Sequence, residues 1–171
     1  MTKKIYIGFD FSMNKPAATL MLDERLYFYF WPLGITNAGI EKYRTANVRV
    51  VSRGLDSIEK KDKKNSQLVL IHTIRSTDLA NLIVRDLDDF IAAHVGSDDS
   101  YELFIATEGL SYSSKGDATL NLATYKGVLL SKLYEHYGLT LKRLFTYSPM
   151  TMKSVAGCAG KNKSKQINGK Q

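Results

Sequence analysis

Two short apolar stretches decide the fold, and each ends on an acid: KIYIGFD at Lys4–Asp10 and ELFIATE at Glu102–Glu108. Both are rich in β-branched and aromatic residues, as expected of central strands that are buried on both faces of a parallel or mixed sheet. Open α/β sheets place their ligand sites at the carboxyl ends of such strands. If these two strands are neighbours, Asp10 and Glu108 lie side by side at that edge.

Two carboxylates a few ångströms apart repel each other unless a proton or a cation lies between them. An all-oxygen site selects a hard divalent cation such as Mg²⁺. A second interpretation stays open from these residues alone. Asp10 can be a turn residue at a strand end, and Glu108 a solvated loop acid, because acids are common at turns.

The composition predicts one compact domain. A chain of 171 residues with 44% hydrophobic content can bury a single core. It has no apolar run long enough to span a membrane and no recognisable signal peptide at its start. Its one cysteine, Cys158, excludes an internal disulfide and a cysteine zinc site. We therefore expect an intracellular, cytoplasmic setting.

The positive charge is concentrated near the C-terminus. The net charge is +7, and the last acid is Glu135, after which come Lys142, Arg143, Lys153, Lys161, Lys163, Lys165 and Lys170. A stretch of one sign is typical of a surface that binds phosphate backbones. The alternative is a solvated tail, which is common for charge runs.

Hydrophobic periodicity predicts an α/β order, with antiparallel strands first and crossover helices later. The predicted elements after the first strand are a hairpin of Ala17–Leu22 and Arg25–Trp31 joined by Asp23-Glu24, a half-exposed strand at Asn47–Arg53, a helix at Thr77–Val95, the Glu102–Glu108 strand, a helix at Asp117–His136, a strand at Thr140–Tyr147, and a third helix opened by Ser148-Pro149.

The two longer helices are each expected to bury one face. In the first, Thr77 is the expected N-cap, and the apolar face comprises Leu79, Leu82, Ile83, Leu87, Phe90 and Ile91. In the second, the expected stripe comprises Leu120, Ala123, Gly127, Leu130 and Tyr134. The small residues Ala123 and Gly127 predict a close approach of another backbone.

This order, with acids closing two main strands, resembles the ribonuclease H-like fold, an α/β fold whose mixed sheet joins antiparallel hairpin strands to parallel strands between helices. Residues Glu108–Leu133 resemble the second motif of RuvC-type Holliday junction resolvases, with a glutamate, a polar segment and a helix that carries the pair Lys126-Gly127. GFDFS at Gly8–Ser12 resembles the first motif of that family. Ser148–Lys165 resembles its next segment, although the family's glycine spacing is one residue tighter.

The resemblance, which is to phage-type members, covers roughly residues 1–22 and 100–171 of a single nuclease domain, 1–171, and leaves residues 32–76 as an insertion. It implies a structure-selective endonuclease that cuts Holliday junctions or other branched DNA by two-metal-ion hydrolysis. The implied cofactor is Mg²⁺, which Mn²⁺ can replace, and the implied assembly is a homodimer.

The resemblance also implies roles for particular residues. Asp10 and Glu108 are the expected catalytic metal ligands. The expected contacts with the DNA backbone are Lys126, the polar-segment residues Ser113 and Lys115, and the basic residues Lys153, Lys161, Lys163 and Lys165.

The chain departs from the family in one important respect, because RuvC-type resolvases use further aspartates on a last helix. Here no acid follows Glu135, and Asp117, at a helix start, is better suited to N-capping. The chain is therefore expected to bind branched DNA and cut it poorly, as a truncated enzyme or a non-catalytic DNA-binding relative. GFDFS also resembles the first phosphate loop of actin-like and sugar-kinase ATPases, but Ser12 stands where those loops need glycine.

Overall fold

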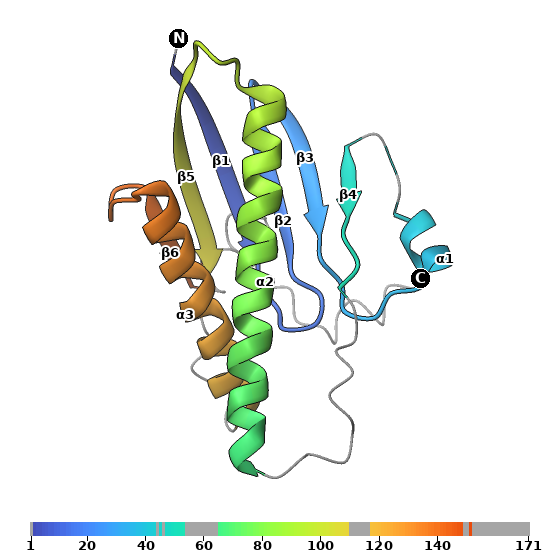
Figure 1. Cartoon of the computed structure of the whole chain (residues 1–171). Helices are drawn as coiled ribbons and strands as arrows, with labels where there is room; N and C mark the ends of the chain where they lie inside the picture. The colour runs from blue at the N-terminus through green and yellow to red at the C-terminus, as the bar shows by residue number, and fades with distance from the viewer. Residues whose placement is uncertain are drawn as a thin grey trace, which may run out of the picture.

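The computed structural model describes residues 2–43, 45, 47–53, 65–109, 117–148 and 151 of the chain. In this part, a six-stranded sheet is accompanied by helices (Figure 1). In chain order the elements are β1 (Thr2–Asp10), β2 (Ala17–Leu22), β3 (Arg25–Phe30), α1 (Asn37–Glu41), β4 (Val48–Val50), α2 (Asn65–His94), β5 (Ser100–Glu108), α3 (Asp117–Tyr137) and β6 (Leu144–Tyr147).

The strand order across the sheet is β4-β3-β2-β1-β5-β6. β2 runs antiparallel to β1 and β3, whereas the pairs β1–β5, β5–β6 and β3–β4 are parallel. Every strand except β2 therefore ends at the same side of the sheet, which we call the carboxyl edge. This is the mixed α/β sheet that the sequence predicts, with antiparallel hairpin strands next to parallel strands.

The predicted hairpin between β2 and β3 is confirmed, with Leu22 paired to Arg25. The two connecting residues both have left-handed backbones, Asp23 with φ 50° and Glu24 with φ 63°. A two-residue turn of this kind matches the twist of the flanking strands, and aspartate tolerates the conformation better than most residues. β3 ends at Phe30, one residue before the predicted end.

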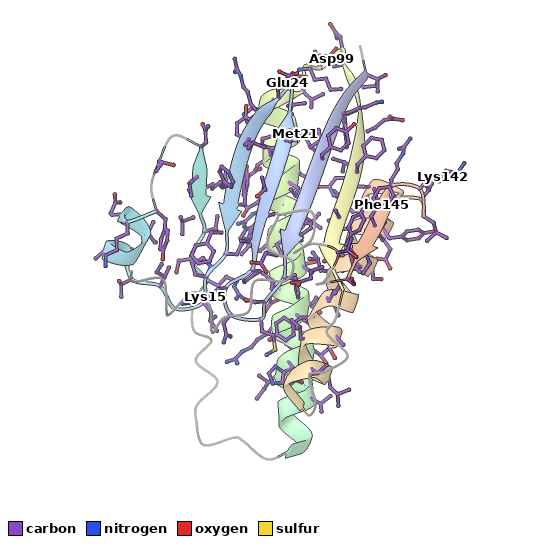
Figure 2. The ribbon with its side chains drawn as sticks, turned by 180° about the vertical axis from the view of Figure 1, so that it is seen from behind. Lys15, Met21, Glu24, Asp99, Lys142 and Phe145 are labelled. Atoms are coloured by element: carbon purple, nitrogen blue, oxygen red, sulfur yellow. The ribbon has the colours of Figure 1, made fainter. Side chains whose placement is uncertain are left out.

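Both long helices pack on one face of the sheet. That face supplies alternate residues of each strand, such as Ile5, Ile7 and Phe9 of β1, which pack against α2 and α3 in one buried cluster. The prediction that the central strands are buried on both faces is wrong for the described residues. The opposite face exposes 42% of Tyr6 and 38% of Met21, and Figure 2 shows Met21 and Phe145 on this side, with α2 and α3 behind the sheet.

A buried polar contact joins β3 to α2. The Trp31 indole N–H donates to Oδ2 of Asp86 at 2.6 Å, and both residues are fully buried. Arg49, on β4, donates to the other carboxylate oxygen at 3.3 Å. Because an unpaired buried carboxylate is highly unfavourable, these two donors determine how the β3–β4 side of the sheet sits on α2.

The predicted helix Thr77–Val95 starts too late, because α2 begins at Asn65. Thr77 is not a cap, since its hydroxyl donates to the carbonyl of Thr73 one turn earlier. The predicted apolar face is confirmed, with Leu79, Ile83, Leu87 and Phe90 buried. Figure 1 shows the first turns of α2 extending beyond the carboxyl edge.

α3 has the predicted extent to within one residue, but its buried face differs. Its buried side chains are Tyr125, Lys126, Leu129 and Leu133, whereas Leu120 is 68% and Tyr134 55% exposed. A Cβ added at Gly127 would meet nothing within 4 Å, so no backbone approaches closely there. The predicted stripe is therefore wrong.

Two further predictions have mixed outcomes. The half-exposed strand at Asn47–Arg53 shortens to β4, although Arg53 still forms a bridge to Leu33. The helix after β6 begins as expected, because Ser148 Oγ accepts a hydrogen bond from the backbone N–H of Thr151 at 3.1 Å. The rest of that helix lies outside the described residues.

Candidate metal centre and DNA-binding edge

Asp10 and Glu108 end two neighbouring parallel strands. The register of β1 and β5 runs to Phe9 opposite Thr107, so the next residue on each strand is one of the two acids. Neighbouring strands lie about 5 Å apart, which is therefore the approximate separation of the two backbones. The sequence expectation that the acids come side by side at the carboxyl edge is met by this register.

The two acidic side chains also leave the sheet on the same face. Phe9 and Thr107 are buried against the helices, so Asp10 and Glu108, one residue further on, point to the opposite face. Asp10 is exposed and Glu108 half-buried. Among the described residues, the pair is thus accessible to solvent.

The end of β5 is held from the β6 side. The backbone N–H of Gly109 donates to the Tyr147 carbonyl at 2.6 Å. A Cβ at position 109 would lie 3.2 Å from that same carbonyl oxygen, so any other residue would push the two backbones slightly apart. The backbone that carries Glu108 is therefore held close to its neighbour directly beyond the acid.

Lys126 holds the end of β5 from the helix side. Its ammonium group donates to the backbone carbonyl of Glu108, and the residue is only 8% exposed. Burial lowers the pKa of Lys126, while the nearby Glu108 charge acts in the opposite direction. A lysine so buried positions a strand end better than it contacts a phosphate backbone, so the structure favours a positioning role over the predicted DNA contact.

The other predicted DNA contacts cannot be placed in the same way. Ser113 and Lys115 lie outside the described residues, and so do Lys153, Lys161, Lys163 and Lys165. Their contacts with DNA remain predictions.

The chemistry of the acid pair fits a divalent cation. Two carboxylates on adjacent, rigid strands supply the hard oxygen ligands that Mg²⁺ prefers, and this ion usually keeps several waters as well. Among the described residues, no group of three or more His, Cys, Asp or Glu side chains gathers to hold a metal. The described acids therefore suit one hydrated cation, and a second ion would need ligands beyond them.

The carboxyl edge also holds basic residues that the sequence analysis did not select. Arg53 follows β4, and His72 and Arg75 lie on the early turns of α2. They were overlooked because residues 32–76 resemble nothing in the family and α2 was expected to start at Thr77. The helical spacing of Val69, His72 and Arg75 was the available signal.

Comparisons with known proteins add a likeness to a solved structure. No family model matches the sequence, and no curated protein matches it. The RuvC structure from Thermus thermophilus is similar with a TM-score of 0.42 and 11% sequence identity, covering 95% of this chain and 75% of that one. The fold assignment itself rests on the strand order and register described above.

Among the described residues, no helix combines the length and apolar character that crossing a bilayer requires.

Proposed function

We propose that this protein is a RuvC-like, structure-selective DNA endonuclease, and that Asp10 and Glu108 are its metal-binding catalytic acids. The observation that supports this most is the pairing of β1 with β5, which ends both strands on acids that point to one accessible face. Strand-borne carboxylates keep the fixed geometry that phosphodiester hydrolysis requires.

In this proposal the chain's own residues orient the site. Asp10 and Glu108 would hold Mg²⁺, which supplies an activated water and charge neutralisation at the scissile phosphate when bound. Lys126 and Gly109 would keep the end of β5 at a constant distance from α3 and β6, through the Glu108 carbonyl and the Tyr147 carbonyl. Three basic residues near the C-terminus, Lys161, Lys163 and Lys165, would bind the DNA backbone without reading bases.

A second candidate is a DNA-binding relative that does not cut. It is favoured by the absence, among the described residues, of a third potential metal ligand near the acid pair. Loss of a second metal site would reduce transition-state stabilisation more than DNA binding.

One experiment separates these candidates. Binding and cleavage are measured on a four-way junction, a flap and a linear duplex of equal length, with Mg²⁺ or Mn²⁺. Preferential binding and cutting of the branched substrates supports the endonuclease, with Asp10→Asn abolishing cutting while binding persists. Binding of branched DNA without cutting supports the second candidate. Equal, weak binding to all three substrates contradicts both.

A further inference from the structure

A recess opens at the carboxyl edge, on the helix side of the sheet. Its volume is about 450 Å³, within the range of small-molecule sites. Its walls come from the segments after β1, β3 and β4, from the early turns of α2, and from Tyr125 on α3. All of these lie among the described residues, and we call this feature the edge recess.

The edge recess is lined by residues close in the structure to the backbones of Asp10 and Glu108, although the two acidic side chains point to the other face of the sheet. Met13, in its wall, follows Asp10 by three residues, a span of at most about 10 Å. Tyr125, in another wall, directly precedes Lys126, which binds the Glu108 carbonyl. A DNA strand advances about 3.4 Å per nucleotide, so about three nucleotides span the distance from Asp10 to Met13, and the strand would pass around the carboxyl edge from the face of the acid pair to the helix side.

One positive charge of the recess is fixed in place. The Arg53 guanidinium donates from Nε to the Trp31 carbonyl at 2.9 Å and from Nη2 to the Met13 carbonyl at 2.7 Å. Both acceptors are backbone carbonyls, so they fix the orientation of the guanidinium at the recess. Such preorganisation lowers the entropy lost when an anion binds.

The other charged side chains of the recess lining include both a cation and an anion. Arg75 adds a second guanidinium, and Asp78, one helical turn later on α2, adds a carboxylate. Asp78 would repel a bare phosphate or sulfate, and the volume exceeds what one such ion fills. The lining therefore suits a ligand that has both an anionic part and a hydrogen-bond donor.

The rest of the lining is apolar and aromatic. Leu33, Leu79 and Leu82 contribute apolar surface. The His72 and Tyr125 rings meet edge to face, with centroids 5.9 Å apart. A flat heterocyclic base is the kind of group that packs against such a surface.

We propose that the edge recess receives one unpaired nucleotide of branched DNA, with its phosphate against Arg53 and Arg75 and its base beside Asp78. This inference rests on the proposed function, since it presupposes that the substrate is DNA. The recess is too small for a base pair in a duplex, whereas a branch point can present single bases. Asp78 accepts a hydrogen bond from an exocyclic amino group, which cytosine has and thymine lacks.

The test uses three four-way junctions that differ only at the branch point: fully paired, with one unpaired cytosine, or with one unpaired thymine. Affinity for the full chain is measured by fluorescence anisotropy, with Ca²⁺ in place of Mg²⁺. We expect the unpaired cytosine to improve affinity about 10-fold over the paired junction, and thymine to improve it several-fold less, since one good base contact supplies about 1–3 kcal/mol.

Two variants locate the effect in the edge recess. Asp78→Asn should remove the preference for cytosine over thymine, and Arg75→Gln should reduce the gain from either unpaired base. Asp89→Asn and Arg85→Gln, exposed positions about two to three turns further along α2 and absent from the recess lining, are the matched controls and should keep both effects. Urea unfolding of each variant shows whether it retains the fold, and the comparison of the three junctions with the unaltered chain needs no variant.

The outcomes separate this inference from the proposed function. Salt-dependent binding of all three junctions with equal affinity overturns the edge recess as a nucleotide site and leaves the proposed function standing. Tighter binding of the unpaired junctions that persists unchanged in Asp78→Asn and Arg75→Gln also overturns it. Absence of salt-dependent binding to any junction overturns both.

Discussion

Lys126 on α3 donates a hydrogen bond to the backbone carbonyl of Glu108, the last residue of β5. The lysine is buried, and burial lowers its pKa. A desolvated ammonium is unfavourable by itself, so its contact with this carbonyl and the nearby Glu108 charge compensate for its burial. The contact joins the helix layer to the strand end that carries a candidate metal ligand.

Removing this ammonium group should loosen the strand end. We expect Lys126→Met to reduce the free energy of unfolding by about 1.5–3 kcal/mol, the usual range for a hydrogen bond to a charged group. Trp31, the chain's one tryptophan and fully buried, reports unfolding in urea by fluorescence. Lys142→Met, at an exposed position, is the control and should change stability little. An unaltered midpoint in Lys126→Met would contradict the positioning role.

The carboxylate of Asp86 should be among the most sensitive positions of the core. Asp86→Ala leaves the Trp31 indole N–H without its acceptor and Arg49 without one of its partners, so we expect a loss of about 3–5 kcal/mol. Asp89→Ala removes an exposed partner of the same arginine and should lose under about 1 kcal/mol. Chemical denaturation of both variants checks the difference, and equal losses would contradict it.

Stability should fall at high pH because of Tyr137. Burial, together with its hydrogen bond to Asp88, raises the pKa of Tyr137 well above the ordinary value of 10.0. The folded state thus keeps a proton that the unfolded chain releases above about pH 10. The protonated Tyr137 therefore contributes fully to the free energy of unfolding below that pH. Above it, this contribution falls by up to about 1.4 kcal/mol per pH unit.

Urea unfolding between pH 9 and pH 11, a range chosen around the ordinary tyrosine pKa of about 10, tests this directly. Tyr137→Phe should show a weaker decline than the unaltered chain, although it starts about 1 kcal/mol less stable after losing the hydrogen bond. Tyr134→Phe, at an exposed position of α3, is the control and should decline like the unaltered chain. An identical decline in all three would refute the assignment to Tyr137.

DNA binding should depend steeply on salt through the C-terminal lysines. Replacing Lys161, Lys163 and Lys165 together by glutamine should reduce the slope of log K against log salt by about 2–3 units, since each phosphate contact contributes about 0.9. Anisotropy titrations on a four-way junction at several salt concentrations measure that slope. An unchanged slope would mean that these lysines only increase solubility.

The sheet could be predicted because the amino-acid composition of β1 and β5 is typical of buried strands. Their alternating buried residues are nearly all β-branched, aliphatic or aromatic, and each strand ends abruptly on an acid. The buried face of α3 could not be read so easily. Its buried residues include Tyr125 and Lys126, whose amphipathic side chains look like surface residues until their partners, His72 and the Glu108 carbonyl, are known.

The site was predictable only in part, for a related reason. Asp10 and Glu108 lie on strands with a strong pattern, so their shared edge follows from one parallel pairing. The edge recess depends on α2 reaching back to Asn65 and on Arg53 being held by two backbone carbonyls. Those are tertiary contacts between distant segments, and no local pattern encodes them.

The central claim is that Asp10 and Glu108 together hold a divalent cation, and Mn²⁺ titration followed by calorimetry tests it most directly. We predict saturable binding to the unaltered chain, weakened at least about 10-fold, or about 1.4 kcal/mol, in both Asp10→Asn and Glu108→Gln. Asp23→Asn, in the β2–β3 turn at the opposite edge of the sheet, should bind Mn²⁺ like the unaltered chain. Equal affinity in all four proteins, or no saturable binding to any, would contradict the claim.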